Sequence, residues 1–275
     1  MDLSKIKKQG QKIKKDIFKK FIEIKEGHPG SILSIFDVVN CLYLGKFIKS
    51  KKKIKLNDYF IMSKGHAGSL QYPYLVLNGI LNKNEWKNWG KTKVKSKKRS
   101  SLRIFPNNLI KGIDITSGSL GHGLGIAAGI AISDKQKKIK KNIWVIISEG
   151  ELYEGSIWEA LLFIKHHNLN QIKIILDRNN LIILGNTEDC LKLSPIKNKI
   201  SGFGYNIKEI NGHNYNQIFN GLNFLKKNDK KCKVLIANTI KGKSVSFMEN
   251  KTNWHYWQKL TKMDEKKLIN ELKND

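Results

Sequence analysis

The clearest structural signal in the sequence is the stretch Ile143-Trp144-Val145-Ile146-Ile147-Ser148-Glu149-Gly150-Glu151. Its apolar residues predict a buried strand, and the acid and glycine that follow predict a turn into a helix. A second apolar run, Ile172 to Leu176, leads directly to Asp177 and Asn179. Strand, helix and strand in this order predict a parallel pair, whose strands end at the same edge of a sheet. Glu149 and Asn179 are therefore expected to face one small volume, although a helix separates them in sequence.

Helical and strand-like patterns alternate along the rest of the chain. Helices are expected at about 5–25, 33–44, from the turn after residue 62 to about 78, 121–133, 156–167 and 215–226, and strands at 59–62, 143–147, 172–176, 205–209 and 233–237. This alternation predicts an α/β fold, a doubly wound parallel sheet with helices on both faces. Residues 1–275 contain no Pro- or Ser-rich linker and are expected to form a single domain, with a solvated Lys/Ser-rich loop at 91–101.

The polar residues at the predicted strand ends suit a divalent cation. Glu149 offers a carboxylate, Asn179 offers an amide oxygen, and the turn around them offers backbone carbonyls. Mg²⁺ prefers such hard oxygen ligands and commonly completes its shell with phosphate oxygens. The sequence therefore predicts a magnesium site that also binds a phosphorylated compound.

This constellation resembles the thiamine diphosphate motif, in which an acid framed by glycine precedes an asparagine by some thirty residues. Six surrounding sequence motifs narrow the resemblance to the transketolase family. In chain order they are Gly27-His28-Pro29-Gly30, Ser63-Lys64-Gly65-His66, Thr116-Ser117-Gly118-Ser119-Leu120-Gly121, Glu151-Leu152-Tyr153-Glu154-Gly155, Lys241-Gly242-Lys243 and Trp254-His255. Their order and approximate spacing are those of the N-terminal, diphosphate-binding half of that family, over about residues 5 to 260.

The resemblance implies a set of site residues. Those implied to bind thiamine diphosphate are Lys64, His66, Gly118, Ser119, Leu120, Gly150, Glu151, Asn179, Ile183, Lys241 and His255. The implied Mg²⁺ ligands are the side chains of Glu149 and Asn179 and the backbone carbonyl of Leu181. The implied catalytic residues are His28, His66 and His255. Imidazole and ammonium groups are suited to these roles because they bind phosphate oxygens and can transfer protons.

More specific roles follow from the same resemblance. His28 is expected to contact the sugar substrate, whereas His66 and His255 are expected to contact the diphosphate. Gly150 and the backbone after it would offer N–H groups at a helix start, where the dipole favours anions. Ile183 would support the bent cofactor by packing. Glu154 matches an acid that the family places at a dimer interface.

The chain also departs from the family pattern. Where the family has Gly-Asp-Gly, this chain has Ser148-Glu149-Gly150, so the carboxylate stands one methylene further from its backbone. Because Mg²⁺ requires near-ideal octahedral geometry, either the longer side chain must fold back or the loop must shift. Ile104-Phe105-Pro106 replaces a Gly-His-Pro word, and His122 stands where glutamine is common.

The resemblance further implies a divided enzyme, because the chain matches only the diphosphate-binding half. Transketolases transfer a two-carbon ketol unit between sugar phosphates, a reaction of the pentose phosphate pathway, and the cofactor performs the difficult chemistry. A C-terminal subunit would supply the pyrimidine-binding half and its activating glutamate. The expected assembly is a heterotetramer with two copies of each subunit.

Composition and charge argue against several other classes of protein. The formal net charge of +28 is high, but only Arg99, Arg103 and Arg178 are arginine among 51 basic residues, and no aromatic stacking platform accompanies them, so nucleic acid is not the expected partner. Three cysteines are too few for a disulfide framework. No signal peptide or apolar run near twenty residues is present, so a cytoplasmic protein without a membrane span is expected.

Two alternatives remain open from the sequence. The first is half of another thiamine diphosphate enzyme, such as the α subunit of a 2-oxoacid dehydrogenase or a protein like deoxyxylulose-phosphate synthase. The second is a decayed, non-catalytic module that binds the cofactor or nucleic acid. The loss of the usual aspartate and of one histidine favours the second alternative, whereas the words around Lys64 and His255 favour transketolase.

Overall fold

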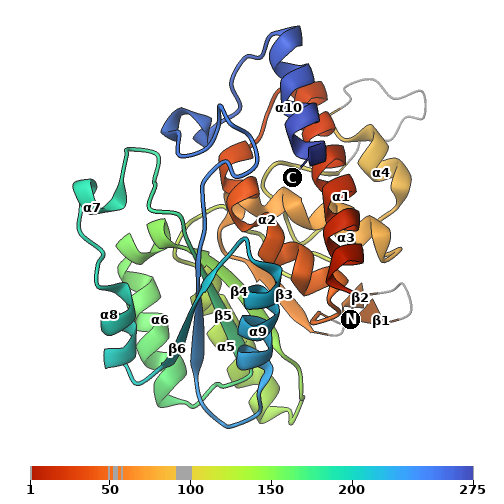
Figure 1. Cartoon of the computed structure of the whole chain (residues 1–275). Coiled ribbons are helices and arrows are strands. Elements are labelled where there is room, and N and C mark those ends of the chain that lie inside the picture. Colours follow the sequence, from red (N-terminus) through yellow and green to blue (C-terminus); the bar gives the residue numbers. More distant parts are fainter. Residues whose placement is uncertain (1, 49, 52–54, 57, 91–100, 275) are drawn as a thin grey trace.

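The computed structural model describes residues 2–48, 50–51, 55–56, 58–90 and 101–274 (Figure 1). The α-helices are α1 (Leu3–Ile24), α2 (Pro29–Leu44), α3 (Gln71–Leu77), α4 (Lys83–Asn88), α5 (Gly123–Gln136), α6 (Gly155–His166), α7 (Thr187–Cys190), α8 (Ile196–Gly202), α9 (Tyr215–Lys226) and α10 (Lys262–Asn274). The strands are β1 (Ser50–Lys51), β2 (Lys55–Leu56), β3 (Tyr59–Met62), β4 (Ile143–Ser148), β5 (Ile172–Arg178), β6 (Asn206–Asn211) and β7 (Lys233–Asn238). Short 3₁₀ helices are η1 (Gly65–Leu70), η2 (Glu149–Tyr153) and η3 (Thr252–His255).

Strands β3 to β7 form one parallel sheet in the order β3-β4-β5-β7-β6, as the alternating pattern predicts. The pairing register aligns the ends of the central strands: Ser148 pairs with Asp177, and Arg178 pairs with Asn238. The loops that follow β4, β5 and β7 therefore begin at one edge of the sheet. This is the edge where open α/β sheets bind their ligands.

Helices cover both faces of the sheet (Figure 1). On β4, Trp144 and Ile146 pack with α2 and α9 in one core, whereas Val145 and Ile147 pack with α5 and α6 in the other. Side chains of successive strand residues point to opposite faces, so a strand between two helical layers must be apolar throughout. All six residues of β4 are buried, which explains the continuous apolar run in the sequence. Helix α10 packs against α1.

Several element boundaries differ from the sequence-based prediction. Helix α2 begins at Pro29, because proline suits the first helical position, where no N–H partner is needed. The segment after β3 forms η1 before α3 instead of one α-helix. Helix α5 begins at Gly123, because Gly121 has a φ of +81° that is incompatible with a helix.

Two further sequence predictions concern the periphery. Of the predicted solvated loop at 91–101, residues 91–100 lie outside the described residues, and Ser101 donates its backbone N–H to Glu85 at 3.1 Å. Within the described part of the chain, the helices are all too short or too polar to cross a membrane.

Candidate active site

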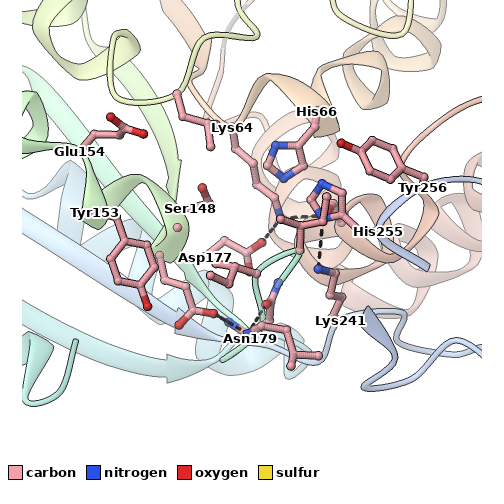
Figure 2. A pocket seen from close by; sticks show the side chains of 17 residues that line it. Lys64, His66, Ser148, Tyr153, Glu154, Asp177, Asn179, Lys241, His255 and Tyr256 are labelled. Carbon is pink, nitrogen blue, oxygen red and sulfur yellow. Dashed lines mark hydrogen bonds and ion pairs between the residues drawn. The ribbon is translucent and has the colours of Figure 1, made fainter. Parts of the chain in front are cut away.

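A cavity of about 340 Å³ opens at the carboxyl edge of the sheet (Figure 2). The segments that follow β4, β5 and β7 line it together with residues of α2 and η1. Its lining combines residues from all these segments: Ser31, Lys64, His66, Leu120, Ser148, Glu149, Gly150, Tyr153, Glu154, Asp177, Asn179, Leu181, Ile182, Ile183, Lys241, His255 and Tyr256. Carboxylate, amide, imidazole and ammonium groups therefore meet in one enclosed volume, as the sequence analysis predicted for Glu149 and Asn179.

The Glu149 side chain folds back onto the loop after β5. Its Oε1 atom accepts the backbone N–H groups of Asn179 at 2.9 Å and of Leu181 at 3.1 Å. Its Oε2 atom is buried and has no hydrogen-bond partner. Burial, followed by the nearby charge of Asp177, raises the pKa of Glu149 to about 7. A buried oxygen without a partner is costly, and a bound cation would satisfy it.

The serine before this acid does not strain the turn. Ser148 has φ −95° and ψ 158°, an extended conformation that every residue can adopt, so glycine is not required there. Its backbone N–H donates to Glu151 at 2.8 Å, and Gly121 donates its backbone N–H to the same carboxylate at 3.1 Å. Ser63 donates its hydroxyl to Glu151 as well. The Glu151 side chain therefore holds together three segments that surround the cavity.

Lys64 forms a buried ion pair with Asp177 at the end of β5 (Figure 2). Ser34 donates its hydroxyl to this carboxylate at 2.9 Å, and Thr239 also donates to it. Ser34 additionally accepts the amide N–H of Asn179 at 2.9 Å, which orients the side chain of that residue. The positive charge of Lys64 is therefore largely neutralised within the protein.

Lys241 supplies a second buried ammonium group to the cavity, and its Nζ lies 3.2 Å from Nδ1 of His255. Burial and the neighbouring Lys64 lower the pKa of Lys241 to about 8. Because Lys64 is paired with Asp177, Lys241 is the ammonium group best placed to bind an anion in this cavity.

Three imidazoles cluster beside these lysines. The ring centroids of His28 and His66 are 5.6 Å apart, and His255 lies 5.4 Å from His28 and 5.3 Å from His66. Burial and the nearby lysines lower the pKa of His28 to about 4 and of His255 to about 3, and they lower the pKa of His66 well below its usual value. The cluster is therefore neutral at pH 7, and its rings act as hydrogen-bonding groups that carry no charge.

A second cavity of about 650 Å³ adjoins the imidazoles and opens outward. His28 and Tyr256 line it together with Phe105, whose ring lies 5.3 Å from that of His28 in an edge-to-face arrangement. The Nδ1 atom of His28 is buried and has no partner. The absence of a Cβ at Gly118 makes room for the Phe105 ring. This outer cavity offers a route to the imidazole cluster with one polar and one aromatic wall.

The structure brings most of the predicted site residues to the inner cavity. Lys64, His66, Leu120, Glu149, Gly150, Asn179, Leu181, Ile183, Lys241 and His255 line it. His28 lies in the outer cavity, and Gly118, Ser119 and Glu151 line neither. Glu154 lines the mouth of the inner cavity and is exposed. The roles assigned to these residues stay predictions.

Sequence reasoning missed several residues that shape the site. Ser34 and Thr239 anchor Asp177, and Tyr256 forms a wall shared by both cavities. For the two hydroxyl residues no local signal exists, because their partner lies far away in sequence. Tyr256 directly follows the Trp254-His255 motif, and this position could have indicated that it lines the cavities.

The fold and the site together define a class of protein. An open parallel sheet, an acid and an amide at adjacent strand ends, and buried ammonium groups facing them are typical of α/β proteins that bind a phosphorylated cofactor with a divalent cation. Among the described residues, no group of three or more His, Cys, Asp or Glu side chains could hold a metal ion by itself. A cation here would therefore rely on the mixed oxygen set of Glu149, Asn179 and a carbonyl, with ligand oxygens completing it.

Residues 10–269 match the family described as the transketolase thiamine diphosphate-binding domain. The chain therefore belongs to the transketolase family, and the resemblance predicted from its sequence words is confirmed, as is the enzyme class. The family also favours the transketolase interpretation over the alternatives that the sequence left open.

Several relatives of similar length are named as transketolase subunits. The chain is 31% identical over 258 residues to a subunit of the apulose-4-phosphate transketolase of Phocaeicola vulgatus, with 93% of this chain and 90% of the relative covered. It is 34% identical over 257 residues to the subunit of the same name from Actinobacillus succinogenes, with 90% and 88% covered. A 6-deoxy-6-sulfo-D-fructose transketolase subunit from a Clostridium species is 31% identical over 269 residues, with 97% and 96% covered.

Solved transketolase structures share the fold. The transketolase of Campylobacter jejuni matches with a TM-score of 0.83 and 26% identity, covering 94% of this chain and 41% of that one. A transketolase of Pichia stipitis matches with a TM-score of 0.84 at 23% identity, covering 97% and 40%. The chain thus spans about two fifths of the length of these transketolases. The structural similarity confirms the predicted doubly wound α/β fold.

Proposed function

We propose that this chain is the N-terminal subunit of a two-chain transketolase, and that it binds thiamine diphosphate with Mg²⁺ in the inner cavity. One observation carries the proposal: Glu149, whose Oε2 is buried without a hydrogen-bond partner, and Lys241, which carries a buried ammonium group, line the same cavity at the carboxyl edge of the sheet. The first group calls for a cation and the second for an anion. A magnesium diphosphate satisfies both.

The side chains of the cavity fit the implied cofactor. Glu149, Asn179 and the Leu181 carbonyl would hold Mg²⁺, while Lys241 and the neutral His66 and His255 would donate hydrogen bonds to diphosphate oxygens. When bound, thiamine diphosphate supplies a carbon nucleophile that accepts the two-carbon unit. The protein contributes the geometry of the groups that would bind and orient the cofactor.

His28 is the group in this chain best placed to handle a substrate proton. It is neutral at pH 7, lines the outer cavity beside the His66 and His255 rings of the inner cavity, and has an unsatisfied Nδ1. A neutral imidazole can accept a proton from a substrate hydroxyl or hydrogen-bond a carbonyl oxygen. A sugar phosphate entering through the outer cavity would present its carbonyl end to this residue.

A partner subunit belongs to the same proposal, because relatives of the same length are named as subunits. Exposed apolar side chains lie near the cavity mouth, and a pyrimidine-binding subunit would cover them. They include Ile183 at 48% exposure, Leu184 at 81% and Leu191 at 67%. A second exposed set, Ile126 on α5 with Leu162 and Phe163 on α6, would suit contact between two copies in a heterotetramer.

Substrates follow the same reasoning. Ketol transfer between sugar phosphates, a reaction of pentose phosphate metabolism, is the activity proposed, in the cytoplasm that the sequence analysis expects. The sugars after which the relatives are named, apulose 4-phosphate and 6-deoxy-6-sulfofructose, indicate that subunits of this length act on varied sugars with an anionic end.

Calorimetric titration of the full chain with thiamine diphosphate tests the cofactor proposal. We expect binding that requires Mg²⁺ and disappears when EDTA is added. Thiamine without phosphate should not compete, because Lys241 and the cation would bind the diphosphate group that it lacks. Binding that is equally strong without a divalent cation, or no binding at any cofactor concentration, would contradict the proposal.

A further inference from the structure

His213 lies between β6 and α9, outside both cavities, and both of its ring nitrogens are engaged. Its Nε2 accepts the backbone N–H of Ile240 at 2.9 Å, and its Nδ1 lies 2.9 Å from Oδ2 of Asp37. A backbone N–H can only donate, so Nε2 carries no proton and the ring hydrogen resides on Nδ1. These contacts define a neutral imidazole that donates to Asp37 and accepts from Ile240.

Ile240 occupies a sensitive position in the chain. Strand β7 ends at Asn238, so the sheet supplies no acceptor for the Ile240 N–H. The residue before it, Thr239, donates its hydroxyl to Asp177, and the residue after it, Lys241, places its ammonium group in the inner cavity. A displacement of the Ile240 backbone would therefore move Lys241 directly.

The other side of His213 is anchored on α2. Asp37 is 6% exposed, accepts a hydrogen bond from the Tyr215 hydroxyl at 3.2 Å and lies 3.9 Å from the ammonium group of Lys14. Helix α2 begins directly after His28, which lines the outer cavity. His213 thus connects the helix that follows His28 with the loop that carries Lys241.

We propose that His213 is a positioning residue, which holds Lys241 in place for the cofactor diphosphate by accepting the Ile240 N–H. The inference rests on the proposed function, because it takes the anion that Lys241 meets to be that diphosphate. His213 itself contacts neither cavity, so its effect would pass through the backbone of residues 239–241.

Two variants separate the two nitrogens of this ring. His213→Gln places an amide oxygen near the position of Nε2, so it can still accept from Ile240. His213→Asn is one methylene shorter, so it can reach Asp37 and cannot reach Ile240. We expect His213→Asn to weaken thiamine diphosphate binding to the full chain by about tenfold in the presence of Mg²⁺, and His213→Gln to stay within about threefold of wild type.

Amide hydrogen exchange provides a readout that needs no cofactor. In His213→Asn, the peptide containing Ile240 should exchange faster than in wild type, whereas in His213→Gln its exchange should stay slow. The melting temperatures should fall by similar amounts, because each variant loses one contact. If His213→Asn does not fold, slow exchange and retained affinity in His213→Gln would still support the inference, and loss of either would overturn it.

The outcomes distinguish the inference from the proposed function. A wild-type chain that binds no thiamine diphosphate contradicts the proposed function, whereas exchange at Ile240 still reports on the hydrogen bond. A wild-type chain that binds the cofactor, together with equal affinities in the Asn and Gln variants, overturns the positioning role of His213. Equal exchange rates at Ile240 in both variants overturn it as well.

Discussion

Glu149 accepts the backbone N–H of Asn179 at 2.9 Å with one carboxylate oxygen and keeps the other oxygen buried without a partner. Glutamate is one methylene longer than aspartate, and this length lets the side chain reach the loop N–H groups with one oxygen while the other oxygen stays free of protein partners. The first oxygen also accepts the backbone N–H of Leu181, so it orders the loop that carries the other predicted metal ligands. Of the two outcomes expected from the extra methylene, a side chain that folds back or a loop that shifts, the structure shows the first.

Glu149→Gln separates these two functions. The amide oxygen can still accept the N–H groups of the loop, while the amide nitrogen replaces the oxygen that would meet the cation. We expect Mg²⁺-dependent affinity for thiamine diphosphate to fall more than about tenfold, a change of about 1.4 kcal/mol or more. The melting temperature without cofactor should hardly change, and calorimetry together with thermal denaturation measures both.

Glu159→Gln is the matched control, because Glu159 is a glutamate on α6 that lines neither cavity. Glu149→Asp keeps the charge and is expected to retain Mg²⁺-dependent binding, although its shorter arm releases the loop N–H groups. Unchanged affinity in Glu149→Gln would mean that this acid does not bind the metal, and would favour a decayed cofactor site.

Lys241 should make cofactor binding sensitive to alkaline pH. Its pKa is lowered to about 8 by burial and by Lys64, so the free protein loses this charge above pH 8. Binding a diphosphate favours the protonated form and must then take up a proton, whereas the diphosphate itself is already fully ionised. Affinity should therefore fall by up to about tenfold per pH unit above pH 8.

Lys241→Met should bind weakly at pH 7 and lose this alkaline dependence, while Lys259→Met, at an exposed position, should behave as wild type. Titrations at several pH values between about 7 and 10 measure the slope. A slope that persists in Lys241→Met would assign it to another group.

The Lys64–Asp177 pair is expected to stabilise the fold as well as the site. Both side chains are buried, so removing either partner leaves an uncompensated charge in the interior. Lys64→Met and Asp177→Asn should each lower the free energy of unfolding by about 3–5 kcal/mol. The double variant should lose clearly less than the sum of the two, because it leaves no unpaired charge. Urea denaturation measures this coupling, and additive losses would show that the pair does not interact.

The sequence carries strong signals for the strands and their polar ends, and these predictions are confirmed. Continuous apolar runs mark strands buried on both faces, and a parallel crossover brings their ends together. The partners of Asp177 carry no such signal. Ser34 is 143 positions away from it and Thr239 is 62 positions away, and each is a small hydroxyl residue of a common kind. The packing of α2 at the sheet edge brings Ser34 to Asp177, and the pairing of β5 with β7 brings Thr239 to it.

Other features depend on conformation that local patterns do not encode. The capping contacts of Glu151 form because η2 turns its carboxylate back toward Ser148, and a family resemblance alone would assign this residue to the cofactor. The two faces of His213 likewise depend on the approach of α2 and the loop after β7.

Phe105 should influence which sugars react. Its ring forms an aromatic wall beside His28, so a substrate hydroxyl facing it would lose a hydrogen bond. Phe105→His should raise kcat/KM for hydroxypyruvate relative to pyruvate, two donors that differ by one hydroxyl, by about tenfold in the assembled enzyme. Leu109→His, a change on the same loop at 88% exposure, serves as the control. An unchanged ratio in Phe105→His would place the substrate elsewhere.

Reconstitution of ketol transfer is the most direct test of a two-chain transketolase. The measurement is the rate of two-carbon transfer from a ketose phosphate to an aldose phosphate, with thiamine diphosphate and Mg²⁺, for this chain, for the C-terminal pyrimidine-binding subunit of the same organism, and for their mixture. We expect no turnover by either chain alone and full activity that saturates at equal amounts of both, in a complex with two copies of each. Turnover by this chain alone, or an inactive mixture in which both chains associate and bind the cofactor, would contradict it.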